Sequence, residues 1–286
     1  MTLILSLIAR NFAIQVSDRR LTMTDGTLLT DESNKAILFE NQFIFGYTGL
    51  AEIDQVPTYR WVAEALNEGL QAHPENMTFI VRHLAERLTS QFARIPSTQY
   101  RKLAFVAIGW AADSHDPNLA VKPMLLTVSN ALDRNLKWLP QAESRFKMGL
   151  SILPENKTYI FAANGVGLKG SEEDSIHRNI RRCLARGGGP RAVGRLLATL
   201  MRAVAERSSR VGKSMLISSL PRSAMGDPMT IMSAPLWSTP TFLYAPADVS
   251  SPVAYGPTGV FKAGMFTDMT LQIGRPYLQG QPRILP

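Results

Sequence analysis

The chain opens with MTLILSLIARNFAIQVSDRR (residues 1–20), in which two apolar runs flank the polar pair Arg10-Asn11. Apolar runs of this length on either side of a short polar turn are typical of paired antiparallel strands. We therefore predict strands over residues 2–9 and 11–18, joined as a hairpin.

Two more strand pairs are predicted before residue 50. Residues 35–39 and 42–47 are apolar runs separated by a short polar turn, and they predict a second hairpin. Residues 20–30 predict a shorter pair of strands around Asp25-Gly26, a dipeptide that favours a tight turn. The first fifty residues are therefore expected to contain β-strands only.

Four residues with useful chemistry lie at the ends of these predicted strands. Thr2 stands at the head of the first strand, and removal of Met1 would make it a free N-terminal threonine. Asp18 closes the second strand, Lys35 opens the strand over residues 35–39, and Gly49 lies in the turn after the strand over residues 42–47. A hydroxyl, a carboxylate and an amine that meet at one point are the groups that nucleophilic catalysis requires.

This layout resembles that of the proteasome β-type subunits and their bacterial relatives, which are N-terminal nucleophile (Ntn) hydrolases. The resemblance rests on Thr2, Asp18, Lys35 and Gly49, and on Arg20, which follows Asp18 by two residues. The spacings from Thr2 to Asp18 and from Lys35 to Gly49 agree with the family. The stretch between Asp18 and Lys35 is one residue longer.

The resemblance implies a threonine nucleophile whose own α-amine acts as the base. A threonine hydroxyl needs a base within hydrogen-bond reach. A free α-amine has a reference pKa of about 7.7–8.0 and can accept the hydroxyl proton near neutral pH. Lys35, held by Asp18, would keep a positive charge beside the hydroxyl and favour its ionised form. The N–H of Gly49 would form the oxyanion hole. The product would be an acyl-enzyme ester on Thr2.

The family also implies supporting groups around the nucleophile. Active members hold the amine and the threonine with an Asp and a Ser, on the loop after the last long helix. Here Ser209 and Gly212 stand at those positions, and Asn164 stands where a further serine lies at a glycine-rich turn. Ser208, Ser209 and Asn164 are the candidates to substitute, because each can form a hydrogen bond with an amine.

By the same resemblance, Thr22, Tyr47 and Ala51 line the first substrate pocket. Tyr47 and Ala51 flank the turn that contains Gly49. Because Tyr47 would fill much of the pocket, we expect a preference for small or flat substrate side chains.

The rest of the chain alternates between helical and strand patterns. Apolar spacing predicts helices over residues 52–71, 76–94, 172–186 and 190–208, and strands over residues 103–109, 122–129, 158–163 and 214–220. This order predicts an α+β domain over residues 1–222, with two facing antiparallel sheets and a helix pair outside each, a four-layer αββα sandwich. The Ntn hydrolases have the same fold. Residues 223–286 are rich in proline and predict an extended C-terminal extension, packed on the domain or on a neighbouring subunit.

Composition sets limits on the class of protein. The 286 residues are 45% apolar and 19% charged, enough for a sizeable core. A single cysteine, Cys183, excludes an intramolecular disulfide and suits a reducing cytoplasm. No histidine has a neighbour at ligand spacing, so we expect no metal and no organic cofactor. The apolar stretch near Met1 is too short for a signal peptide or a membrane span, and a cytoplasmic protein is expected.

The net charge of +8 raises the question of a nucleic-acid partner. The charges are distributed along the chain, and the densest arginine cluster lies on and between two predicted helices without interleaved aromatic residues or a recognition motif, which argues against that partner. A basic nucleic-acid-binding protein stays an alternative, and strongly salt-dependent binding would support it.

Taken together, the sequence predicts a threonine-type peptidase or amidohydrolase that acts on a peptide or amide substrate. The family implies a homo-oligomer, as a ring or an open ring. Two alternatives remain: a non-catalytic scaffold subunit with the same fold, and a transpeptidase or ligase that uses the same acyl-enzyme.

Overall fold

The computed structural model describes residues 2–22, 27–30, 33–74, 76–96, 102–112, 121–133, 139–222, 241–245, 258–261 and 264–266. Within these residues the chain forms four α-helices, two large sheets and two short strand pairs. Neighbouring strands run antiparallel, with one exception in the larger sheet. The mixed α+β class predicted from the sequence is confirmed.

The first large sheet has five strands in the order β12-β1-β2-β13-β14. Their bounds are β1 (Leu3–Ala9), β2 (Phe12–Asp18), β12 (Tyr159–Gly165), β13 (Met215–Pro221) and β14 (Thr241–Ala245). The opening hairpin lies at the centre of this sheet, and every residue of β1 and β2 is buried. Covering on both faces explains why these two strands are apolar with few interruptions.

The second large sheet has seven strands in the order β11-β10-β9-β6-β5-β15-β16. Their bounds are β5 (Ala36–Phe39), β6 (Phe43–Thr48), β9 (Ala104–Ala112), β10 (Val121–Ser129), β11 (Lys147–Ile152), β15 (Thr258–Phe261) and β16 (Gly264–Phe266). The parallel exception is β15, which pairs with β5. Two short pairs stand apart: β3 (Leu21–Thr22) with β4 (Leu28–Thr30), and β7 (Glu52–Ile53) with β8 (Val56–Pro57).

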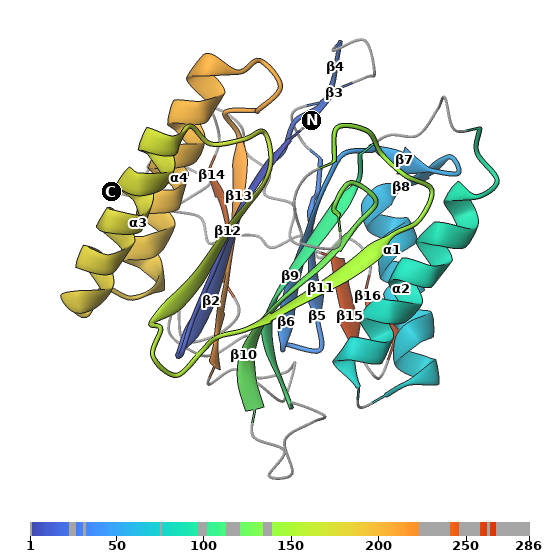
Figure 1. Cartoon of the computed structure of the whole chain (residues 1–286), viewed down its shortest axis with the longest axis horizontal. Coiled ribbons are helices and arrows are strands. Elements are labelled where there is room, and N and C mark those ends of the chain that lie inside the picture. The colour runs from blue at the N-terminus through green and yellow to red at the C-terminus, as the bar shows by residue number, and fades with distance from the viewer. Residues whose placement is uncertain are drawn as a thin grey trace.

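The helices lie on the outer faces of the sheets. Their bounds are α1 (Thr58–Ala72), α2 (Met77–Phe92), α3 (Gly170–Ala185) and α4 (Pro190–Arg207). Figure 1 shows α1 and α2 beside the seven-stranded sheet, α3 and α4 beside the five-stranded sheet, and the two sheets facing each other between them. Within the described residues, none of the helices has the length and apolar content that crossing a membrane would need.

Three clusters of buried side chains correspond to the three contacts between layers. Strand alternation divides them: Leu5 and Leu7 of β1 pack toward α3 and α4, whereas Ile8 packs between the sheets. Among the described residues, the cluster between the sheets consists of eleven buried side chains: Ile8, Ala13, Ala36, Leu38, Ile44, Val106, Ile108, Trp110, Leu125, Leu216 and Leu220.

Two elements differ from the sequence prediction. Helix α1 begins at Thr58 instead of near residue 52, because Glu52–Ile53 and Val56–Pro57 pair as β7 and β8 around Asp54 and Gln55. Those two turn residues have φ of 52° and 62°, in the left-handed region that a right-handed helix cannot contain. Strand β11 lies in a stretch for which no element was predicted. The Asp25-Gly26 turn lies outside the described residues.

Parts of the C-terminal extension complete both sheets. Strand β14 pairs antiparallel with β13 at the edge of the five-stranded sheet. Strand β15 pairs with β5, and the N–H of Glu40 donates to the carbonyl of Val260 at 2.8 Å. These described segments are therefore integrated into the domain through backbone hydrogen bonds.

The layer between the sheets predicts a stability difference between two aliphatic positions of the larger sheet. Replacing the fully buried Ile108 by alanine should lower the free energy of unfolding by about 2–5 kcal/mol, because the transfer energy is lost and a cavity remains. Leu150 is 40% exposed on β11, so Leu150→Ala should cost no more than about 0.5 kcal/mol. Urea unfolding of both variants measures the difference, and equal costs would contradict the assigned layers.

Candidate active site

The ends of four strands meet at one end of the space between the sheets. Thr2 immediately precedes β1, and Asp18 is the last residue of β2, so both belong to the five-stranded sheet. Lys35 immediately precedes β5, and Thr48 ends β6, so both belong to the seven-stranded sheet. Hairpin pairing explains the convergence: the start of one antiparallel strand lies beside the end of its partner.

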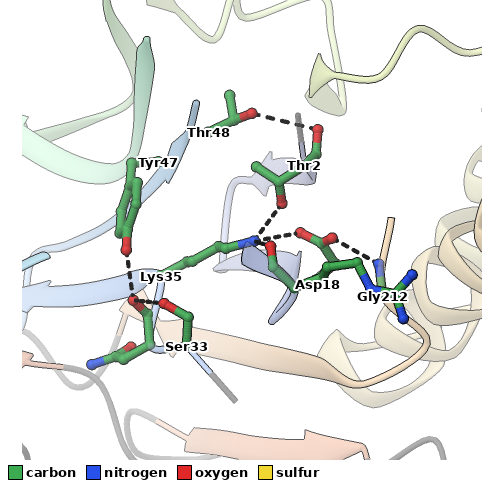
Figure 2. Close-up of polar contacts among 9 residues, drawn as sticks. Thr2, Asp18, Ser33, Lys35, Tyr47, Thr48 and Gly212 are labelled. Carbon is green, nitrogen blue, oxygen red and sulfur yellow. Dashed lines mark hydrogen bonds and ion pairs between the residues drawn. The ribbon is translucent and has the colours of Figure 1, made fainter. Parts of the chain in front are cut away.

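The Lys35 ammonium connects the three predicted side chains, as Figure 2 shows. Its Nζ lies 2.7 Å from Thr2 Oγ1 and 2.9 Å from Asp18 Oδ1. All three residues are buried, with exposed fractions of 3% for Thr2 and 0% for Asp18 and Lys35. The structure therefore brings together the hydroxyl, the carboxylate and the amine that the sequence singled out.

The hydrogen bonds of Lys35 are those of a charged ammonium. Besides Thr2 Oγ1 and Asp18 Oδ1, Nζ donates to the backbone carbonyl of Arg20. An ammonium has three donors and no acceptor, and three acceptors surround this one. Lys35 can therefore stabilise negative charge on Thr2 Oγ1. Because its N–H groups are directed at acceptors, it is not placed to accept the proton of that hydroxyl.

Asp18 is held from two sides. Its Oδ1 accepts from Lys35, and its Oδ2 accepts from the N–H of Gly212 at 2.9 Å. Burial raises the pKa of the Asp18 carboxyl above its ordinary value, while the charge of Lys35 and the N–H groups of Gly212 and Leu3 oppose that rise. The partners thus offset much of the cost of burying a charge at this position.

The backbone of Thr2 is also fixed. Its carbonyl accepts from the N–H of Val166 at 2.9 Å and lies 3.4 Å from the hydroxyl oxygen of Thr48. Gly165 packs directly on this carbonyl: its φ is +107°, and a Cβ there would lie 1.8 Å from the Thr2 oxygen. A side chain at position 165 would therefore displace the threonine.

Gly49 directly follows Thr48, whose hydroxyl lies 3.4 Å from the carbonyl oxygen of Thr2. Its φ is +123°, and a Cβ there would lie 2.2 Å from the carbonyl oxygen of Lys102. Both the backbone conformation and the close approach of residue 102 require glycine at this turn.

The predicted pocket residues have different environments. Tyr47 is 1% exposed, contacts the ring of Phe105, and donates its hydroxyl to the carbonyl of Asn34 at 3.0 Å. Burial raises the pKa of Tyr47, so the phenol stays a neutral donor. Ala51 is partly exposed, and its carbonyl accepts from the N–H of Thr58 at the start of α1. Thr22 ends β3, and its side chain lies outside the described part of the structure.

The predicted supporting residues are distributed around the site. The Arg20 guanidinium donates to the carbonyl of Ser209 at 2.8 Å, and the carbonyl of Ser208 accepts from Val211. Asn164 lies on β12 opposite Ile4. Within the described residues, the side chains of Ser208, Ser209 and Asn164 form no hydrogen bond with Thr2.

Sequence reasoning missed most of the backbone groups of the site. Residue type does not reveal a backbone donor or acceptor. The groups missed for this reason are the N–H of Gly212, the N–H of Val166 and the carbonyl of Arg20. Thr48 could have been found, because it is a hydroxyl residue next to the predicted Gly49 turn.

Among the described residues, His, Cys, Asp and Glu form no group of three that could hold a metal ion. A scan against protein-family models found no match, and a search of the curated proteins found no relative. The interpretation of the site therefore rests on its geometry and on the resemblance in the first fifty residues.

The buried pair predicts strong energetic coupling. Lys35→Met should lower the free energy of unfolding by about 3–5 kcal/mol, because it leaves the Asp18 carboxylate buried without its counter-charge. The double variant K35M/D18N removes both charges and should cost less than the sum of the single variants, by about 0.5–3 kcal/mol. Denaturant unfolding gives all three values.

Lys213→Met is the control, because Lys213 lies in the loop after α4 and forms an exposed ion pair with Glu206 of that helix. It should change stability by no more than about 1 kcal/mol. Additive costs for Lys35 and Asp18 would mean that the pair does not act as a unit.

Proposed function

We propose that the protein is an N-terminal-threonine hydrolase that cleaves a peptide or other amide bond through an acyl-enzyme on Thr2. The observation that carries the proposal is the 2.7 Å contact between Lys35 Nζ and Thr2 Oγ1, with Lys35 paired to Asp18 in a fully buried setting. A buried charge pair directed at a hydroxyl is costly to maintain for structure alone. It is suited to a hydroxyl that has to ionise.

The proposed reaction begins with the removal of Met1. With Met1 present, Thr2 is 3% exposed and its nitrogen is part of a peptide bond. Removal gives Thr2 a free α-amine and opens the start of β1 to a substrate. Because the donors of Lys35 are directed at acceptors, the α-amine is the proposed acceptor of the Oγ1 proton.

Bond making and breaking then follow in two steps. Thr2 Oγ1 attacks the amide carbon, and the oxyanion that forms is stabilised by the N–H of Gly49. The α-ammonium returns the proton to the leaving amine as the C–N bond breaks, leaving an ester on Oγ1. Water, deprotonated by the same α-amine, attacks the ester and releases the carboxylic acid. Lys35 stays charged throughout and stabilises Oγ1 when it is ionised.

The wider proposal follows the resemblance to the proteasome-like Ntn hydrolases. The layer order seen in Figure 1 agrees with the αββα sandwich of that family and supports the assignment. A homo-oligomer and a cytoplasmic setting are parts of the same proposal. The buried Tyr47 supports a shallow first pocket and hence a small or flat substrate side chain beside the cleaved bond.

Two alternatives to hydrolysis remain, and one observation favours the first of them. A non-catalytic scaffold is favoured by the absence, within the described residues, of a hydrogen bond from Ser208, Ser209 or Asn164 to Thr2. A transpeptidase or ligase shares every step up to the ester and differs only in accepting an amine in place of water. Adding amine acceptors to a working enzyme separates this outcome from hydrolysis.

The first test is intact mass spectrometry of protein made in its native host, before and after treatment with a β-lactone or epoxyketone probe. We expect loss of Met1 and a single adduct that maps to Thr2. Thr2→Ala should give no adduct. Lys35→Met should lower the labelling rate by about 100-fold or more, because the charge that favours the ionised hydroxyl is removed.

Denaturant unfolding of Lys35→Met shows whether that variant is folded in the labelling assay, and two further variants act as controls. Thr2→Ser keeps a hydroxyl and should still be labelled, and Lys213→Met should be labelled at the rate of the unmodified protein. Retained Met1 together with no adduct would sink the catalytic proposal and favour the scaffold.

A further inference from the structure

One carboxylate outside the site gathers three hydrogen bonds. Glu172 lies in the first turn of α3, and its Oε2 accepts from the N–H of Lys169 at 2.7 Å. Arg207, the last residue of α4, donates Nη2 to the same oxygen at 2.6 Å and Nε to Oε1 at 2.9 Å. This two-point contact is the strong form of an arginine–carboxylate pair.

Arg207 also contacts the loop 166–169, which follows β12 and begins with a residue bonded to Thr2. Its Nη2 donates to the carbonyl of Gly167 at 3.1 Å. Glu172 and Arg207 thus hold both ends of the stretch from Gly167 to Lys169. Val166, which precedes this stretch, donates its N–H to the carbonyl of Thr2. Two hydrogen bonds therefore connect the pair to the backbone of the proposed nucleophile: one from Arg207 to Gly167, and one from the adjacent Val166 to Thr2.

The residues after Arg207 reach the other side of the site. In the loop 208–214, the carbonyl of Ser209 accepts from Arg20 and the N–H of Gly212 donates to Asp18. The N–H of Arg19 donates to the carbonyl of Ser214 at 3.0 Å. Arg207 therefore directly precedes the loop 208–214, whose Gly212 binds Asp18. Its guanidinium binds Gly167, next to the Val166 that binds Thr2.

Helix electrostatics account for only part of this arrangement. An acidic residue in a first turn and a basic residue in a last turn each suit the helix dipole. That explains the signs of the charges on Glu172 and Arg207. It does not explain the contact of Arg207 with the Gly167 carbonyl, whereas the bond from the Lys169 N–H to Glu172 is the ordinary capping-box contact at the start of α3.

We propose that Glu172 and Arg207 are positioning residues that set the distance between the loop carrying Val166 and the loop carrying Gly212, and thereby align Thr2 with Lys35 and Asp18. The inference rests on the proposed function for its catalytic consequence, because neither residue touches the reacting atoms. A misplacement of about 1 Å at a reacting group can lower a rate about 100-fold. A pair that lies 170 and 205 residues from Thr2 in the sequence can therefore control its reactivity.

The pair is partly exposed, with 26% of the Arg207 side chain and 18% of the Glu172 side chain accessible, so its loss should leave the fold intact. The hydrogen bond from Arg207 lowers the pKa of Glu172 below its ordinary value of 4.5. A carboxylate with a lowered pKa contributes stability above its unfolded pKa and loses it as the pH falls through the folded pKa. The stability difference between the unmodified protein and Glu172→Gln should therefore shrink as the solution is acidified.

The deciding experiment compares Glu172→Gln, Arg207→Lys and Glu206→Gln. Glutamine at position 172 can still accept from the Lys169 N–H but cannot accept both arginine donors, and lysine at 207 keeps the charge without the fork. Glu206→Gln is the matched control. It is the same Glu-to-Gln change at the residue next to Arg207, and Glu206 forms an exposed ion pair with Lys213 that also connects α4 to the loop 208–214.

Two readouts are needed. For the β-lactone probe, E172Q and R207K should lower the maximal labelling rate about 10-fold or more and leave the half-saturating probe concentration within about twofold, whereas E206Q should match the unmodified protein. Amide hydrogen exchange of protein without probe should be faster at Val166 and Gly212 in E172Q and R207K, and unchanged in E206Q.

The outcomes separate the two proposals. No labelling of the unmodified protein would mean that the proposed function fails, and hydrogen exchange then decides the positioning pair alone. Unchanged exchange and unchanged labelling in E172Q and R207K would overturn the pair. Equal effects in E206Q would also overturn the proposal, because the loss would then follow from removing any ion pair at the end of α4 and not from the Glu172–Arg207 contact.

Discussion

The ion pair between Lys35 and Asp18 is the interaction on which the rest of the site depends. It crosses from the seven-stranded sheet to the five-stranded sheet at the point where their strands end. Two charges can remain in such a dry position only if their other hydrogen-bonding groups are satisfied. Thr2, the carbonyl of Arg20 and the N–H of Gly212 meet that requirement. The pair therefore fixes the positions of a hydroxyl and two loops around it.

Local pattern predicted much of the fold. The hairpins of the first fifty residues were recognisable because apolar runs alternate with short polar turns, and α4 because its apolar residues recur at helical spacing. Helix α1 was placed too early, because its first predicted turn is held in β7 and β8 by left-handed backbone at Asp54 and Gln55. Strand β11 depends on pairing with β10, a long-range contact that local pattern does not contain.

The site divides in the same way between side chains and backbone. Thr2, Asp18 and Lys35 were identified from the sequence because each stands at a strand end, and hairpin geometry returns strand ends to one place. Gly212 was noted only as a departure from the family pattern, yet its N–H binds Asp18. A backbone donor has no characteristic residue type, so only three-dimensional structure can show it. The pairing of Glu172 with Arg207 was not foreseen either, because the two residues lie 35 positions apart in the sequence.

The C-terminal strands have a consequence for how the protein is made. Strands β14 and β15 cover the outer edges of β13 and β5, and both are synthesised after the four described helices are complete. Until residue 245 leaves the ribosome, β13 keeps an unpaired row of backbone donors and acceptors, and β5 keeps one until residue 261. Open edges of this kind invite pairing with other chains. The growing polypeptide is thus exposed to aggregation late in translation, and a product truncated before residue 241 never escapes that exposure.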